Sequence, residues 1–168
     1  AEITVTLTSG ATTGLTLVVR DNDNEPVAGA AVALFYRADS EEPGIPYWYE
    51  PAFYGTTNDS GRVTISSDYA TDGYEYTAVI WSQDAARPKI MVKHGLRAPG
   101  SYDLGGQPKE GGQVLAFQEV EVAAYTRVGR PISGAEVWVS YEDENGVRIP
   151  YPLPGFNLDD NGTGTVWV

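Results

Sequence analysis

The sequence EPVAGAAV at residues 25–32 returns as RPISGAEV at residues 130–137, a shift of 105 positions. The alternating apolar residues that precede it follow the same shift, with Leu15, Leu17 and Val19 matching Val120, Val122 and Ala124. Two later blocks also recur, IPY of residues 45–47 at 149–151 and NDSG of residues 58–61 as DDNG at 159–162. Four matching blocks in the same order indicate an internal duplication.

Around this repeat the composition predicts an all-β protein. The chain of 168 residues has 19 Gly and 11 Pro but one Met, and Thr, Val, Tyr and Trp dominate its ordered stretches. Gly and Pro disfavour helices, whereas β-branched and aromatic residues suit a pleated sheet. The strands that we expect cover residues 3–8, 15–20, 30–36, 63–66, 74–81 and 89–93. A Pro- and Tyr-rich excursion, residues 43–54, interrupts them.

The repeat divides the chain into two modules. We expect an N-terminal strand and flexible link at residues 1–13, a first domain at 14–97, a Gly- and Pro-rich linker at 98–113 and a second domain at 114–168. The second copy stops directly after its counterpart of residues 63–66, so we expect it to lack its last strand or strands. An apolar groove and unpaired backbone groups would then be exposed, and both are costly in water.

The block PVAGAAV, followed about thirty residues later by TNDSGRVTI, resembles a broad superfamily of β-sandwiches. These are the immunoglobulin-like modules called carboxypeptidase-regulatory-like, Cna-B-like or bacterial Ig-like domains. The resemblance implies two tandem immunoglobulin-like sandwiches in an extracellular setting, and it implies no single activity. Some members form a Lys–Asn isopeptide bond from a lysine on the first strand. The segments 15–20 and 115–125 contain no Lys, so we do not expect that bond here.

A strand precedes the first module, and its apolar residues alternate with Thr: Ile3, Val5 and Leu7. We expect this strand to insert into the second module of another subunit, a donor-strand exchange by β-augmentation. The acceptor groove would be lined by Val120, Val122, Val137, Val139, Val166 and Val168. Two alternatives stay open: the strand pairs within its own chain, or the chain has been shortened at its C-terminal end.

The net charge of −12 argues against a nucleic-acid partner, because a phosphate backbone requires clustered Lys and Arg. No Cys is present, so neither disulfides nor thiol chemistry is expected. No apolar run is long enough to span a bilayer. The chain begins Ala1-Glu2-Ile3 without Met, which predicts a mature end left by signal-peptide removal and hence secretion to the cell surface.

Catalysis is not expected, since the single histidine, His94, has no partner motif for nucleophilic or metal chemistry. Calcium binding is a candidate property, because Asp21, Asp23 and Glu25 offer alternating oxygen ligands in a turn. Further oxygen-rich turns lie at residues 142–145 and 159–161. The competing interpretation is ordinary turn formation by Asx side chains.

Two acceptor patterns for N-glycosylation occur at Asn58 and Asn161, in equivalent turns of the two copies. Turn formation by the same side chains is the favoured explanation. The aromatic stretch Tyr47-Trp48-Tyr49 could stack on a carbohydrate, although packing at the end of a module or between subunits is the favoured explanation.

The sequence therefore predicts a non-enzymatic structural subunit of an extracellular filament, pilus or tube. Copies of the chain itself would be its partners, joined head to tail by strand exchange. Two alternatives remain: a monomeric adhesin or carbohydrate-binding module, and a fibre or decoration protein of a virion.

Overall fold

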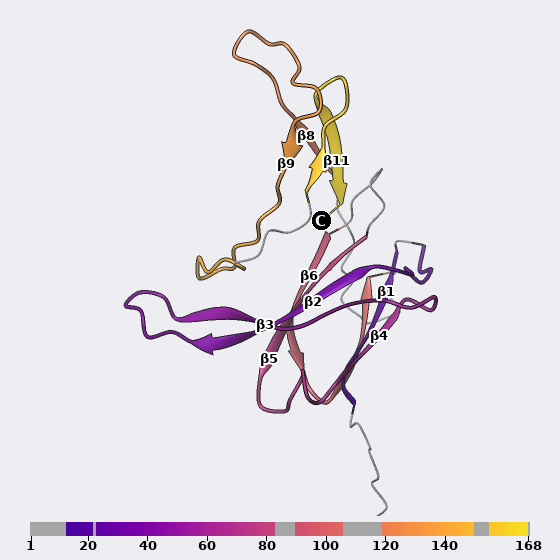
Figure 1. Cartoon of the computed structure of the whole chain (residues 1–168), viewed down its shortest axis with the longest axis vertical. Coiled ribbons are helices and arrows are strands. Elements are labelled where there is room, and N and C mark those ends of the chain that lie inside the picture. The colour runs from indigo at the N-terminus through magenta and orange to yellow at the C-terminus, as the bar shows by residue number, and fades with distance from the viewer. Residues whose placement is uncertain (1–12, 22, 83–89, 106–118, 150–154, 168) are drawn as a thin grey trace, which may run out of the picture.

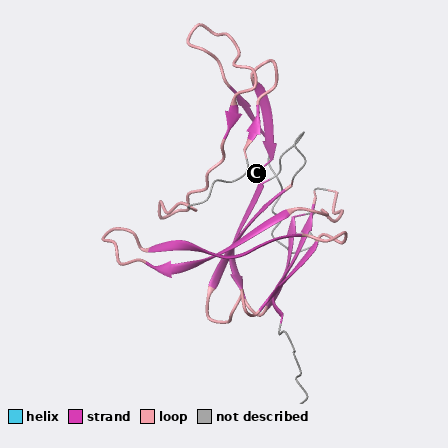
Figure 2. Cartoon of the chain, in the orientation of Figure 1, coloured by secondary structure: helices cyan, strands magenta, loops and turns pink. Residues whose placement is uncertain are grey.

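The computed structural model describes residues 13–21, 23–82, 90–105, 119–149 and 155–167, and every regular element in them is a β-strand (Figure 2). The predicted all-β class is confirmed. None of the described residues belongs to a helix that could cross a membrane. We call the described residues of 13–105 module 1 and those of 119–167 module 2. In Figure 1 module 2 stands at one end of the strands of module 1.

Module 1 is a sandwich of two sheets (Figure 1). The smaller sheet has the order β4-β1-β7, and its strands are β1 (Thr13–Arg20), β4 (Arg62–Ser66) and β7 (Gly100–Gly105). The larger sheet has the order β3-β2-β5-β6, and its strands are β2 (Ala31–Asp39), β3 (Tyr47–Thr56), β5 (Glu75–Trp81) and β6 (Ile90–Arg97). Strand β7 runs parallel to β1, whereas the other pairs in module 1 are antiparallel.

The core of module 1 lies between these two sheets. Alternate residues of β1 point inward, as the period of two requires, and Leu15 and Leu17 are fully buried. They pack on Val32 and Leu34 from β2 and on Ala78 from β5. This layer is the contact that joins the two sheets into one sandwich.

The central strands of the larger sheet are buried on both faces. Val32 and Leu34 of β2 face the sandwich, while Ala33 and Phe35 point the other way and are 2% and 1% exposed. Strand β5 repeats this arrangement, because Val79 on its outer face is also fully buried. A second layer must therefore cover the outside of this sheet.

The described part of module 2 has four strands, which are β8 (Glu119–Ala123), β9 (Glu136–Val137), β10 (Phe156–Asn157) and β11 (Thr163–Trp167). Strand β8 pairs with β11, and β9 pairs with β10, both antiparallel. Val147, Ile149, Phe156, Leu158 and Val166 of module 2 are buried in one cluster with the outer face of β2 and β5.

One type of turn connects many of these strands. In four of them an Asp or Asn side chain accepts hydrogen bonds from the amides two and four positions later, beginning at Asp21, Asn58, Asp143 and Asp159. The residue three positions after the acid or amide has a positive φ, which is why Gly stands there at 61, 146 and 162.

The structure differs from the sequence-based expectation at two places. Residues 43–54, expected to be an excursion, contribute most of β3, and the expected linker 98–113 begins with β7, which pairs with β1. Both strands contain Gly or Pro, which are typical of loops, and this is why the sequence pattern did not predict them. Pro51 lies at a bulge of β3, and β7 begins at Gly100 and ends at Gly105. The expected strand at residues 3–8 lies outside the described residues.

We expect Phe35→Ala to lower the free energy of unfolding by about 3–5 kcal/mol, as truncation of a buried ring does. The residue lies on the outer face of its sheet, so a loss this large requires that module 2 covers it in solution. Chemical denaturation measures the effect, with Val128→Ala as the control because Val128 is 79% exposed. A loss below about 1 kcal/mol for Phe35→Ala would contradict the packing of the two modules.

Candidate assembly site

Module 2 repeats the backbone hydrogen bonds of module 1 strand for strand. The amide of Val19 donates to the carbonyl of Gly61 at 2.8 Å, and the amide of Ala124 donates to that of Gly162 at 2.9 Å. The bond between Thr57 N–H and Ala30 C=O likewise returns between Leu158 and Ala135, at 2.9 Å in both copies.

The register of the strands also returns. Leu15 lies opposite Ile65 in module 1, and Val120 lies opposite Val166 in module 2. Strands β8, β9, β10 and β11 therefore stand in the places of β1, β2, β3 and β4.

The two modules differ in what flanks these strands. Strand β1 has a neighbour on each side, β4 and β7, and β2 lies between β3 and β5. In the described part of module 2, β8 has β11 alone and β9 has β10 alone. One edge of β8 and one edge of β9 thus have no strand beside them among the described residues. An unpaired edge is a template for a further strand.

Burial differs between the modules in the same way. Leu15 is 0% exposed, whereas its counterpart Val120 is 40% exposed. Val122, Val137 and Val139 are half-buried, although Leu17, Val32 and Leu34 at the equivalent positions are at most 1% exposed. The cluster that buries these positions in module 1 includes residues of β5, β6 and β7. No strands of module 2 stand in those places within the described ranges.

The residues predicted to line the acceptor groove therefore differ in how deeply they are buried. Val120 is exposed, while Val122, Val137 and Val139 pack partly against the cluster shared with module 1. Val166 is buried in that cluster, and Val168 lies outside the described residues. The outer face of module 1 thus covers part of the surface that the sequence predicted to be an open groove. The apolar runs AVALF and YTAVI of β2 and β5 are the sequence signal for this cover, because strands buried on one face alternate instead.

A buried carboxylate fixes module 2 on module 1. Asp143, 9% exposed, accepts hydrogen bonds from the hydroxyls of Tyr47 and, at 2.8 Å, Tyr49 on β3. Its other oxygen accepts the amides of Asn145 and Val147 at 2.9 and 3.0 Å. The turn that closes residues 143–147 thus carries its acid into the contact between modules.

These four donors determine the charge state of the acid. Burial acts to raise the pKa of Asp143, but the hydrogen bonds from Tyr47, Val147, Tyr49 and Asn145 outweigh it and lower the pKa to about 2. Burial, together with the same carboxylate, raises the pKa of both tyrosines, which therefore remain hydrogen-bond donors at neutral pH.

The single histidine extends this polar contact. His94 on β6 has Nδ1 2.8 Å from the hydroxyl of Thr77 and Nε2 2.5 Å from the hydroxyl of Tyr141 in module 2. Burial, and then the charge of Arg37, lowers the pKa of His94. Hydrogen bonds therefore occupy both ring nitrogens of His94. The guanidinium of Arg37 stacks 4.5 Å from the centre of the Tyr47 ring.

Other predicted sites have a structural explanation. Asp21 accepts the amides of Asp23 and Glu25 at 3.0 and 2.9 Å, so the turn holds its shape without a cation. No group of three or more metal-ligating His, Asp or Glu residues occurs in the described ranges, and calcium binding stays a prediction. Asn58 caps its own turn, and Asn161 is exposed in the equivalent turn, at the position of Ser60 rather than of Asn58.

The aromatic stretch of β3 lies partly in the contact between the modules. The hydroxyls of Tyr47 and Tyr49 bind Asp143, whereas Trp48 points away and is 38% exposed. This agrees with packing as the favoured explanation of the stretch. Residues 142–145 are the oxygen-rich turn that the sequence predicts, but no local pattern pairs Asp143 with tyrosines almost one hundred positions away.

No protein-family model matches the sequence, and no curated protein is similar to it. Among solved structures, the shaft pilin SpaA from Lactobacillus rhamnosus GG is 13% identical, with 92% of this chain and 81% of the pilin covered and a TM-score of 0.34. A streptococcal ancillary pilin is 15% identical, with 95% and 51% covered and a TM-score of 0.34. A 9R-lipoxygenase from Cyanothece PCC8801 is 16% identical with a TM-score of 0.32, and the match spans 64% of this chain and 18% of the enzyme. Similarity at this level does not assign a function.

We expect Asp143→Asn to destabilise the protein by about 1.5–3 kcal/mol at pH 7, the usual contribution of hydrogen bonds to a charged group. The folded pKa of about 2 lies below the ordinary 3.8. The stability that Asp143 contributes is therefore complete above about pH 4 and is lost as the pH falls towards 2. Denaturation from pH 7 to 2 measures this: the difference between wild type and variant should shrink over that window. Asp39→Asn, an exposed acid at the end of β2, is the matched control. A pH-independent difference would contradict the assignment.

Proposed function

We propose that the chain is a structural subunit of an extracellular filament, pilus or tube, built from two tandem immunoglobulin-like modules and without catalytic activity. The observation that carries this proposal is the unequal completion of two equivalent modules. The same strand positions are flanked on both sides in module 1 and on one side in the described part of module 2. Such a surface is suited to accept a strand from another copy.

The best place for that strand is the open edge of β8. In module 1 the equivalent edge is occupied by β7, which lies parallel to β1 with Leu17 opposite Tyr102 and Val19 opposite Leu104. A strand added to β8 in the same manner would run parallel to it. Its alternate side chains would then cover Val120, which is 40% exposed, and the half-buried Val122.

The N-terminal segment is the proposed occupant. Ile3, Val5 and Leu7 alternate with Thr, so one face of such a strand would be apolar and the other polar. In the register of β7, these three residues would lie opposite Val120, Val122 and Ala124. The segment lies outside the described residues, and its insertion is part of the proposal.

This contact would join two different surfaces of neighbouring subunits. A contact of that kind is heterologous, so repetition produces an open filament or a ring rather than a closed dimer. Each added strand would cover the exposed Val120 and pair backbone groups at the edge of β8, and both changes stabilise the polymer. The acidic surface, with a net charge of −12, would restrain non-specific association of the subunits.

Disulfide trapping tests the proposal directly, because the natural chain has no Cys. One protein carries V5C, a second carries V122C, and the two are mixed under mild oxidation at conditions that permit assembly. We expect cross-linked heterodimers that denaturing electrophoresis resolves, since the two side chains would be neighbours across adjacent strands. V128C replaces V122C in the control mixture and should give no specific cross-link.

Two outcomes would reject strand exchange between subunits. One is a cross-link that forms within a V5C/V122C chain but never between the singly substituted proteins, since that result assigns the strand to its own chain. The other is continued polymerisation after deletion of residues 1–9, measured by light scattering and negative-stain microscopy. A mixture that assembles without any cross-link would contradict the placement of the N-terminal strand beside β8.

A further inference from the structure

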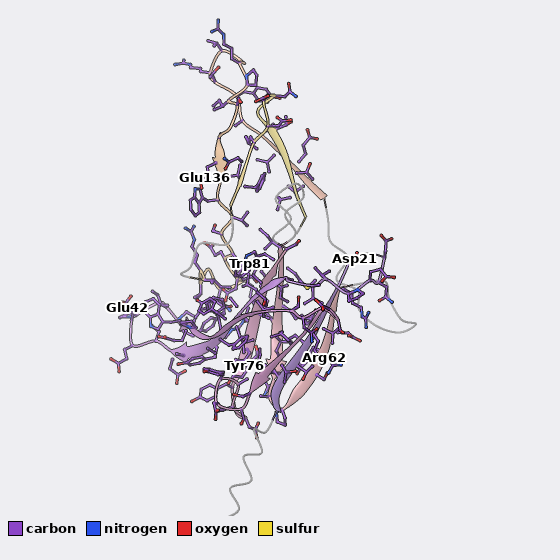
Figure 3. All side chains as sticks on the ribbon, turned by 45° about the vertical axis from the view of Figure 1, so that its right-hand side comes forward. Asp21, Glu42, Arg62, Tyr76, Trp81 and Glu136 are labelled. Atoms are coloured by element: carbon purple, nitrogen blue, oxygen red, sulfur yellow. The ribbon has the colours of Figure 1, made fainter. Side chains whose placement is uncertain are left out.

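A pocket lined by tyrosines lies at the end of module 1 that is remote from module 2. Its volume is about 260 Å³, and its walls include Tyr36 from β2, Tyr76 from β5, and Tyr69 and Tyr74 from the connection between β4 and β5. Figure 3 shows Tyr76 at this end, with Glu136 of module 2 at the other. The strand exchange proposed above makes no use of these residues.

The pocket has a fixed floor and an accessible rim. Tyr76 is 2% exposed, and its hydroxyl accepts the amide of Thr71 at 2.8 Å and lies 3.2 Å from the carbonyl of the same residue. Tyr69 and Tyr74 are 56% and 49% exposed. The hydrogen bonds of Tyr76 tie the connection to β5, so the rim tyrosines are held near the floor rather than free to swing away.

The rings meet at steep angles instead of forming a flat platform. The planes of Tyr36 and Tyr74 are inclined at 70° with centroids 5.3 Å apart, and those of Tyr74 and Tyr76 at 57° with centroids 6.4 Å apart. The ring of Tyr69 packs against the ring of Phe53, with their centroids 5.9 Å apart. A flat sugar ring stacks best on a flat aromatic surface, whereas a corner of several rings suits a compact, rounded group.

The charge of the pocket lining favours a cationic ligand over an anionic one. Among the described residues that line the pocket, Asp68 is the only charged one, and no basic side chain accompanies it. Its carboxylate lies 3.4 Å from the hydroxyl of Ser66, and none of the ion pairs found in the described part of the chain involves it. An anionic ligand would be repelled both by this carboxylate and by the negative faces of the rings.

We infer that this pocket binds a quaternary ammonium group, such as that of choline. Aromatic faces attract a cation, and a quaternary nitrogen has no N–H groups that would need hydrogen-bond acceptors on burial. A primary ammonium is strongly hydrated and would lose more on entering the pocket. The volume lies just below the roughly 300–1,000 Å³ typical of drug-sized ligands, which fits one small head group.

Titration of the full chain with choline chloride, followed by tyrosine fluorescence and calorimetry, tests the inference. We expect saturable binding with one site per chain and a dissociation constant in the millimolar range or lower. The neutral isostere 3,3-dimethylbutan-1-ol has the same shape without the charge, and it should bind at least about tenfold more weakly. Choline affinity should also fall as the salt concentration rises, because Asp68 is exposed.

Substitutions distinguish the contribution of the aromatic rings to choline binding from that of the Asp68 charge and from a general loss of folding. Tyr74→Leu should weaken choline binding by about tenfold or more, whereas Tyr74→Phe, which keeps the ring, should change it by less than about threefold. Asp68→Asn should weaken binding several-fold. Tyr69→Leu tests the exposed side of the rim with the least risk to folding, and Trp138→Leu, far from the pocket, should have no effect.

The inference fails if choline does not bind, if the neutral isostere binds equally well, or if Tyr69→Leu and Tyr74→Leu leave choline affinity unchanged while both variants remain folded. Binding of methyl glucoside in place of choline would assign the pocket to carbohydrate and would equally overturn it. Assembly measured on the same variants should remain normal, so failure here is distinct from failure of strand exchange.

Discussion

Burial of both faces of β2 and β5 is the constraint on which the rest of the structure depends. The inner face of these strands packs on β1 and forms the sandwich, whereas the outer face, with Phe35 and Val79, would be a large apolar surface in water. Module 2 shares one buried cluster with this surface, to which it contributes Val147, Ile149, Phe156, Leu158 and Val166. The two modules are therefore one packed unit, and the half-buried valines of module 2 owe their partial shelter to module 1.

Apolar packing alone would leave the position of module 2 on module 1 poorly defined, because it is not directional. The hydrogen bonds that Asp143 accepts from Tyr47 and Tyr49, and the one between His94 and Tyr141, fix the position of this contact because they are directional and at least partly buried. The turn beginning at Asp143 has the same side-chain hydrogen bonds as the exposed turns beginning at Asn58 and Asp159. The same type of turn that reverses the chain direction elsewhere therefore also contributes to the contact between the two modules.

Repetition of one module in two environments shows what flanking strands contribute. Leu15 and Val120 occupy equivalent positions with equivalent backbone partners, yet one is fully buried and the other is 40% exposed. The difference lies in the neighbouring strands and not in local sequence. Within the described residues, module 2 therefore has open strand edges, and module 1 shares a buried cluster with it.

The sequence by itself determined the all-β class, the positions of β1, β2, β4 and β5, and the register shared by the two modules, because period-two alternation and Asx-Gly turns are local signals. It did not predict β3 and β7, because their Pro and Gly residues are typical of loops. Only pairing with a neighbouring strand identifies these segments as strands. Nor could it show that module 2 lies on the outer face of β2, that Asp143 meets Tyr47 and Tyr49, or that tyrosines from β2, β5 and the β4–β5 connection enclose one pocket. Only the tertiary structure decided these contacts, since each depends on side chains brought together by packing and not by spacing along the chain.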